Sequence, residues 1–285
     1  MVATADIPDL HHFCGRGGKD VMPLWRDPAG TQPNVTRGLL DLLAASYGRT
    51  VPAEDLLAYV YALLANRAYT RRFWNELATP GPRVSLSKDP TLFERAVRLG
   101  RRLLWLHTFA ERFRGEDRGD RVPQGSARCV RGVPTDPDRY PDAFDYDPSS
   151  RTLRVGEGRF APVSPELWGF EVSGLRVVAS WLGYRMRTRK GRKSSPLDEI
   201  RPERWTPAFT EELLELLWVL EHTLAMEPEL EALLDEVVRG PCFTSEELPK
   251  PSEEERRPPR RADAAAPLLE PLETDDPGEA DEEPE

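Results

Sequence analysis

The 285-residue sequence lacks several features that mark whole classes of protein. Its three cysteines, Cys14, Cys129 and Cys242, are odd in number and never spaced as C-x-x-C, which argues against a disulfide framework and a zinc ribbon. No run approaches the roughly 18 to 20 apolar residues that a membrane span needs, and the start has neither a basic segment nor an apolar signal region. We therefore expect a cytoplasmic protein without a membrane partner.

The strings of residues that mark common catalytic sites are also missing. The sequence has no P-loop with its lysine, no nucleophile elbow and no paired-carboxylate signature. His11 and His12 are neighbours in an expected strand and point to opposite faces, so together with Cys14 they do not predict a metal site. We expect His107 and His222 to lie on helices and to find local partners. The chain is therefore expected to hold no catalytic residue, no cofactor and no metal.

One glycine-rich string resembles a cofactor-binding motif, and the residues around it decide whether that interpretation holds. Residues 13–17 spell F-x-G-x-G, the turn with which many methyltransferases approach S-adenosylmethionine. Such a turn follows a buried parallel strand and opens a helix, whereas here two histidines precede it and Pro23 follows closely. A hairpin turn is the favoured interpretation. The alternative is a complete, atypical S-adenosylmethionine-dependent methyltransferase that uses Gly15 and Gly17.

The net charge of -10 is distributed unevenly along the chain. Residues 245–285 carry 15 acidic and 5 basic residues, which leaves 34 of each sign in residues 1–244. The C-terminal stretch is rich in Pro, Glu and Asp and cannot bury enough apolar surface to offset its ordering entropy. We expect a disordered acidic tail at 245–285 that follows a neutral folded body at 1–244.

Hydrophobic periodicity predicts an α+β fold for this body, mostly helical with a small antiparallel β portion. A β hairpin is expected at 9–25, and Ala143–Tyr146 and Thr152–Val155 are expected strands around the turn at Asp147–Ser150. Helices are expected at about 35–47, 52–78, 90–114, 173–184, 207–225 and 228–239. The basic outer face of the helix at 90–114 carries Arg95, Arg98, Arg101 and Arg102.

Most tryptophans recur with Leu or Phe at helical spacing. This pattern predicts core packing, with stacking on flipped bases as the alternative. The residues concerned are Trp74, Trp105, Trp168, Trp181, Trp205 and Trp218.

The densest cationic run of the body follows the helix at 173–184 and places six positive charges in nine residues. Phosphates could neutralise such a run, and arginine also reads guanine edges in the major groove. The alternative is a solvated loop without a ligand. The candidate DNA-binding residues are Arg185, Arg187, Arg189, Lys190, Arg192, Lys193, Ser194 and Ser195, with Arg16 and Lys19 of the hairpin as a second choice.

Several segments, in this order along the chain, resemble the C-terminal target-recognition region of type ISP restriction-modification enzymes. The segments are Ile7–Phe13 with Gly15–Gly18, Tyr59–Tyr69, Pro80–Val84, Gly100–His107, Val172–Gly174 and Trp181–Tyr184. The resemblance covers roughly residues 5 to 243. It implies sequence-specific recognition of double-stranded DNA in partnership with an adenine-specific DNA methyltransferase domain or subunit.

The same resemblance implies that chemistry is supplied elsewhere. The family's methyltransferase uses an N-P-P-Y-like string, which this chain lacks, since its one Pro-Pro is Pro258-Pro259 in the tail. S-adenosylmethionine is therefore expected in a methyltransferase domain outside this chain, which looks like a separated or truncated C-terminal half. Besides the atypical methyltransferase, a third possibility is an interaction protein that has lost DNA binding.

Overall fold

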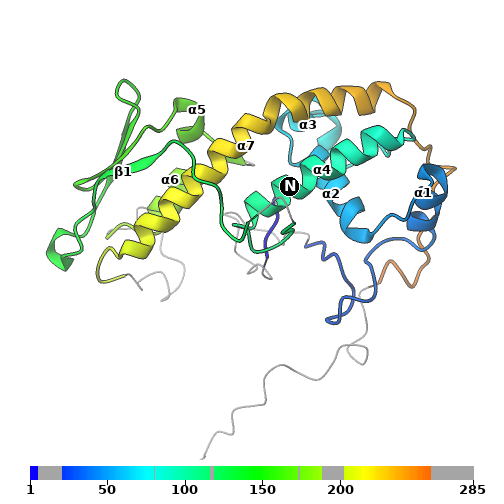
Figure 1. The fold of residues 1–285 in the computed structure, drawn as a ribbon, viewed down its shortest axis with the longest axis horizontal. Coiled ribbons are helices and arrows are strands. Elements are labelled where there is room, and N and C mark those ends of the chain that lie inside the picture. The colour runs from blue at the N-terminus through cyan, green and yellow to red at the C-terminus, as the bar shows by residue number, and fades with distance from the viewer. Residues whose placement is uncertain (6–20, 80, 116–118, 173, 188–201, 258–285) are drawn as a thin grey trace, which may run out of the picture.

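The computed structural model describes residues 1–5, 21–79, 81–115, 119–172, 174–187 and 202–257. Its helices are α1 (Leu39–Tyr47), α2 (Ala53–Leu64), α3 (Arg67–Arg72), α4 (Pro90–His107), α5 (Pro165–Trp168), α6 (Val177–Gly183) and α7 (Pro207–Arg239), with 3₁₀ helices η1 (Glu76–Ala78) and η2 (Pro137–Arg139). Strands β1 (Arg128–Arg131), β2 (Phe144–Asp147), β3 (Thr152–Val155) and β4 (Gly158–Ala161) form an antiparallel sheet in the order β1-β4-β3-β2, and β5 (Glu171–Val172) pairs with β6 (Leu175–Arg176). Figure 1 shows a helical lobe and a sheet lobe, with α7 running through both. The expected α+β class is confirmed.

The crossing of α2 and α4 forms the centre of the helical lobe. Asp89 caps α4 by accepting hydrogen bonds from its first backbone N–H groups, and Pro90 occupies the first position, so the helix begins where the sequence predicts. Gly100 of α4 lies against Ala58 of α2, and a Cβ atom at Gly100 would fall 1.8 Å from the Ala58 carbonyl oxygen. A residue without a side chain is therefore needed at this backbone contact.

The sheet lobe is organised by two tight turns. The Asp147 carboxylate accepts hydrogen bonds from the backbone N–H of Ser149 at 3.0 Å and from the Ser150 hydroxyl at 2.9 Å, which confirms the predicted turn between β2 and β3. Gly156, with φ at +53°, takes part in the turn into β4. The inward side chains of the sheet pack against α5, α6 and the N-terminal half of α7, and they include Leu153, Val155 and Phe160.

α7 is one helix of 33 residues where the sequence predicted two, at 207–225 and 228–239. The predicted break at Pro228 is wrong. Proline costs the helix about 3 kcal/mol, but each fully buried leucine contributes about 1.5–3 kcal/mol and the apolar stripe continues past it. Leu213 and Leu217 lie in the core of the sheet lobe, while Leu230 and Leu233 lie in the core of the helical lobe. Figure 1 shows that the helix axis bends on its way from one lobe to the other, as a proline in a helix interior leads one to expect.

Two of the helices in the N-terminal part of the chain have boundaries that differ from the predicted ones because of local backbone features. The helix predicted at 35–47 begins later, because Gly38 adopts a left-handed conformation with φ at +81°. The helix predicted at 52–78 divides into α2, α3 and η1. The division lies at Asn66, which is extended and whose side chain caps α3 by accepting from the Ala68 N–H at 2.8 Å.

Two later helices are also shorter than predicted. The helix predicted at 90–114 ends at the C-terminus of α4, because Phe109 and Ala110 adopt positive φ angles that an α-helix does not allow. Part of the segment predicted as a helix at 173–184 forms β6, and only the residues after it form α6.

The predicted hairpin and tail are described only in part. The hairpin at 9–25 lies mostly outside the described residues, and within 21–25 Trp25 forms an isolated bridge with Pro33 rather than a strand. Residues 245–257 were assigned to the disordered tail by composition, but they are placed against the helical lobe. There the Glu255 carboxylate accepts a hydrogen bond from the Arg37 N–H at 2.7 Å. The remainder of the predicted tail, 258–285, lies outside the described residues.

The tryptophans divide between the cores and the surface. Trp105 and Trp205 are buried, and Trp168, Trp181 and Trp218 pack partly buried against the cores. Trp74 is 71% exposed, so the prediction of core packing is wrong there, because the residue follows the end of α3 instead of lying on a helix. None of the helices in the described part of the chain combines the length and the apolar character that a membrane crossing requires.

Candidate nucleic-acid interface

Only the first part of the predicted DNA-binding segment lies among the described residues. Arg185 and Arg187 follow α6 and are described, whereas Arg189, Lys190, Arg192, Lys193, Ser194, Ser195, Arg16 and Lys19 lie outside. The two described arginines show where the start of the segment lies.

Arg185 is held by the protein itself. Its guanidinium lies 3.7 Å from the ring centre of Trp181 and 5.3 Å from that of Phe209, and it forms an ion pair with Glu212 at 3.0 Å. Its backbone carbonyl accepts a hydrogen bond from the Tyr140 hydroxyl at 2.5 Å. With stacking, a counter-charge and a backbone contact, Arg185 fixes the end of α6 to the start of α7.

Arg187 contacts the segment that leads into β2. Its backbone N–H donates to the Pro141 carbonyl at 2.9 Å, and its guanidinium donates to the Pro137 carbonyl at 2.5 Å. The Asp142 carboxylate lies 3.7 Å from the guanidinium, and the Arg187 side chain is about half exposed. The described start of the basic segment therefore lies beside η2.

The described chain resumes at residue 202, and Trp205 lies in the same lobe. Trp205 is fully buried, packs edge-on against Trp181 with ring centres 6.3 Å apart, and donates its indole N–H to the Thr210 hydroxyl at 2.9 Å. The core of the sheet lobe thus holds Met186, just before the undescribed residues 188–201, and Trp205, just after them.

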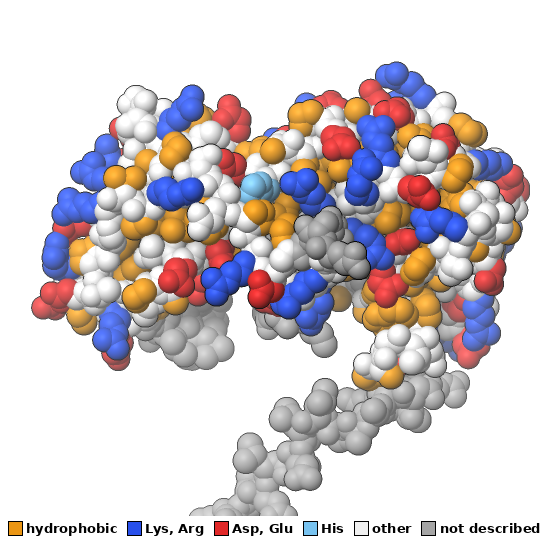
Figure 2. All heavy atoms as spheres, viewed as in Figure 1, with side chains coloured by type: hydrophobic (Ala, Val, Ile, Leu, Met, Phe, Trp, Pro, Cys, Tyr) orange, Lys and Arg blue, Asp and Glu red, His pale blue; other side chains and the backbone are white. Residues whose placement is uncertain are grey.

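The basic outer face that the sequence predicts for α4 is largely neutralised by acids of other elements. Arg95 forms an ion pair with Glu236 of α7 at 2.8 Å, and Arg101 forms one with Asp55 of α2 at 2.7 Å. Arg98 similarly faces a glutamate of α7 at 3.5 Å. Figure 2 shows Lys and Arg side chains over both lobes, with acidic side chains beside many of them. Arg95, Arg98 and Arg101 therefore form ion pairs within the fold, which the sequence of the helix alone does not reveal.

Further arginines of the exposed sheet face were not singled out from the sequence. Arg131 of β1, Arg159 of β4 and Arg154 of β3 are cross-strand neighbours in register. The alternation of buried and exposed residues in β3 and β4 indicates that Arg154 and Arg159 face outward, and the pairing of Arg131 with Arg159 places Arg131 on the same face. Only strand pairing brings the three together.

The described histidines have local partners, as expected. His107 lies between the Tyr61 hydroxyl at 2.6 Å and the Thr223 hydroxyl at 2.9 Å, and His222 contacts the Pro123 carbonyl at 3.0 Å. Burial, and after it the positive charge of the N-terminus, together lower the pKa of His107 to about 4. In the described ranges no group of three His, Cys, Asp or Glu side chains could hold a metal ion.

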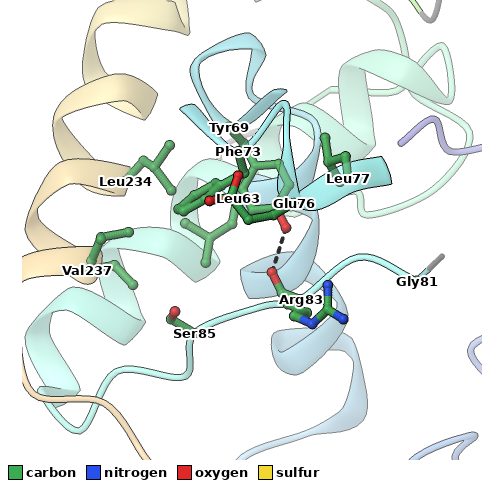
Figure 3. A pocket seen from close by; sticks show the side chains of 11 residues that line it. Leu63, Tyr69, Phe73, Glu76, Leu77, Gly81, Arg83, Ser85, Leu234 and Val237 are labelled. Atoms are coloured by element: carbon green, nitrogen blue, oxygen red, sulfur yellow. Dashed lines mark hydrogen bonds between the residues drawn. The ribbon is translucent and has the colours of Figure 1, made fainter. Parts of the chain in front are cut away.

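A pocket of about 200 Å³ opens between α2, α3, η1 and the C-terminal half of α7 (Figure 3). The Tyr69 hydroxyl crosses it to donate to the Arg83 carbonyl at 2.6 Å, and the polar lining otherwise comes from Glu76 and Ser85. Its walls are mainly leucine, valine and aromatic side chains. The volume is below the roughly 300–1,000 Å³ of ligand and cofactor sites, so the pocket suits an apolar side chain better than a cofactor.

Comparison with known proteins places these features in context. The family model of the Type ISP C-terminal specificity domain matches residues 1–216. No curated protein matches the chain.

Three solved structures are similar to the chain. A nuclease-deletion mutant of the Type ISP restriction-modification enzyme LlaGI in complex with a DNA substrate mimic is 20% identical, with a TM-score of 0.44 over 64% of this chain and 16% of that one. A DrdV–DNA complex is 19% identical, with a TM-score of 0.48 over 75% and 20%. The ATP-dependent Type ISP enzyme LlaBIII bound to DNA is 17% identical, with a TM-score of 0.43 over 68% and 12%. The chain therefore spans a fifth or less of each of these three polypeptides.

Proposed function

The chain belongs to the family of Type ISP C-terminal specificity domains, and we propose its function from that membership. The function is recognition of a target sequence in double-stranded DNA as the specificity part of a restriction-modification system. The family match over residues 1–216 is the observation that carries the proposal.

The basic segment at 185–195 is the proposed contact with DNA. Arg185 is occupied by its own stacking and ion pair, so its role is to anchor the segment. The charges that contact phosphates are then Arg189, Lys190, Arg192 and Lys193, with Arg187 at the root and the hydroxyls of Ser194 and Ser195 as further donors. Arg16 and Lys19 are the second proposed contact.

The proposed partner is an adenine-specific methyltransferase domain or subunit that grips the same duplex. That partner would bind S-adenosylmethionine and perform the chemistry, in the cytoplasm. The histidines of the described part of this chain are held by hydrogen bonds within the fold, and none of them is proposed as a catalytic residue.

Binding of the full chain to mixed-sequence duplex DNA across a salt series tests the proposal. The variant for comparison replaces Arg187, Arg189, Lys190, Arg192 and Lys193 by Ala and keeps Arg185, which the fold uses. Each phosphate contact contributes about 0.9 to the slope of log affinity against log salt, so this variant should lose several units of slope.

A matched control removes exposed arginines of the helical lobe, Arg71 and Arg98, which have acidic partners and lie away from the segment. This control should retain the slope of the parent chain. If the parent chain shows no salt-dependent binding even at low salt, the chain does not hold DNA on its own and the proposal in this form is wrong.

A further inference from the structure

The exposed face of the four-stranded sheet carries a row of three arginines. Arg131 of β1 is paired in register with Arg159 of β4, and Arg159 is paired with Arg154 of β3. Residues directly opposite in an antiparallel sheet place their side chains on the same face, within about 5.5 Å at Cβ. We call these three residues the arginine row.

Such a row is unfavourable for the folded chain by itself, because like charges directly opposite each other repel. The flanks are partly compensated, since Arg131 lies 3.0 Å from Glu157 and Arg154 lies 3.2 Å from Asp147. The central Arg159 is exposed and has no acidic partner within ion-pair distance among the described residues. A charge placed between two like charges without a counter-ion of its own points to an anion supplied from outside.

The arginine row lies close to η2, which Arg187 at the start of the basic segment also contacts. The row is next to the β3–β4 turn, where Glu157 also accepts a hydrogen bond from Arg139 of η2 at 2.9 Å. The Arg139 guanidinium, with Arg131, holds the pKa of the Glu157 carboxyl below its usual range. Arg187, at the root of the basic segment, donates to Pro137 of the same η2. The row and Arg187 therefore both lie close to η2, on the lobe whose outer edge Figure 2 shows lined with basic side chains.

We infer that the arginine row binds the sugar-phosphate backbone of the duplex that the basic segment contacts, as a second, sequence-independent contact. The inference rests on the proposed function. Neighbouring strands are about 4.8 Å apart, so the row spans about 10 Å, while each DNA strand carries one phosphate per ~3.4 Å of helix axis. Guanidinium groups bind phosphate oxygens bidentately, so the row can engage two or three phosphates of one strand.

The experiment measures affinity for duplex DNA against salt for the full chain and three variants, Arg159→Ala, Arg159→Lys and the triple change of Arg131, Arg154 and Arg159 to Ala. Arg159→Ala should lower the salt slope by about 1 and the triple change by about 2 to 3. Arg159→Lys should retain the slope, because it keeps the charge. The losses should be equal on target and scrambled duplexes, because phosphate contacts carry no sequence information.

Arg71→Ala serves as the control, since Arg71 is an exposed arginine of α3 paired with Glu231, outside the sheet lobe. It should leave the slope unchanged. The thermal midpoint of Arg159→Ala should equal or exceed that of the parent chain, because the change removes a repulsion and breaks no ion pair between described residues. If the triple variant fails to fold, the single Arg159→Ala variant decides the question.

The possible outcomes separate this inference from the proposed function. A parent chain without salt-dependent binding overturns both. A parent chain that binds, together with Arg159→Ala and triple variants that keep its slope, overturns the arginine row alone and leaves the basic segment as the contact. Unchanged DNA binding with lost association to an acidic methyltransferase surface would assign the row to a protein partner and would also overturn the inference.

Discussion

His107 is a buried histidine whose two ring nitrogens both have hydroxyl partners. The Thr223 hydroxyl donates to the Val219 carbonyl at 2.7 Å, so it accepts from Nε2–H of His107, and Nδ1 accepts from the Tyr61 hydroxyl. This arrangement satisfies the neutral imidazole and offers no acceptor for a second proton. Burial, followed by the N-terminal charge, accordingly lowers the pKa of His107 to about 4.

The lowered pKa predicts a loss of stability in mild acid. Between pH 6.5 and about 4, the unfolded chain binds a proton on this histidine that the folded chain does not, so the free energy of unfolding falls as the pH falls through that window. The loss should approach about 3 kcal/mol. Urea unfolding at pH 7 and pH 4.5 measures it, with His107→Gln as the comparison because glutamine does not titrate. An equal loss in both proteins would assign the acid sensitivity to other groups.

Gly100 makes the contact on which the crossing of α2 and α4 depends. Gly100→Ala improves helix propensity by about 1 kcal/mol, but the new methyl group would lie 1.8 Å from the Ala58 carbonyl oxygen. Overpacking against backbone typically costs about 1–3 kcal/mol or more, so the variant should be less stable by about 2 kcal/mol or more. Chemical denaturation measures the difference.

Gly183 of α6 provides the control for the Gly100→Ala variant. It is the last residue of α6, and a Cβ atom there meets no atom within 4 Å. Gly183→Ala should change the free energy of unfolding by no more than the helix-propensity difference. Equal stability of the parent chain and Gly100→Ala would show that the two helices can separate without loss.

The element boundaries show which local signals are reliable. The start of α4 and the β2–β3 turn were predicted correctly, because Asp89 and Asp147 satisfy backbone N–H groups within three residues of themselves. The break at Pro228 was predicted wrongly, because the energy that keeps α7 continuous comes from burial against partners far away in the sequence. Signals that act over a few residues can be read from sequence, and those that depend on packing cannot.

At the scale of the molecule, α7 joins two hydrophobic cores. Its residue Trp218 packs against both and donates its indole N–H to the Ala127 carbonyl at 2.9 Å. Because one continuous helix contributes to each core, unfolding of either lobe removes packing surface from the other. We therefore expect the two lobes to unfold as one cooperative unit.

Cavity-forming changes in each core test this cooperativity. Leu233→Ala in the helical lobe and Leu213→Ala in the sheet lobe should each cost about 2–5 kcal/mol. Amide hydrogen exchange of α4 and β3 reports on the two lobes separately. Each variant should weaken protection in both elements to a similar extent, whereas a loss confined to the mutated lobe would show that the lobes unfold independently.

The segment at 245–257 should contribute to stability, although its composition resembles the acidic stretch that follows. Glu255 accepts hydrogen bonds from the backbone of Ser252 and Arg37, and these bonds lower its pKa to about 2. A chain shortened to residues 1–257 should therefore match the thermal midpoint of the full chain, and one shortened to 1–244 should melt lower. If both shortened chains melt alike, the segment contributes nothing to the fold.

The sequence by itself determined the α+β class, the start of α4, the β2–β3 turn and the family resemblance, which the family match supports. These features depend on residue type and on spacings of a few residues. It also identified the basic segment at 185–195, whose contact with DNA stays a prediction. Only the tertiary structure decided which arginines the fold already uses.

That decision depends on pairing between distant parts of the chain. Arg95 is neutralised by a glutamate more than a hundred residues away, and Arg185 by its ion pair with Glu212 of α7. Arg159 is left without an acidic partner among the described residues because the strand register places it between two other arginines. Charge can be counted along a sequence, but its availability to a ligand is determined by strand register and helix packing, which join residues that no local pattern connects.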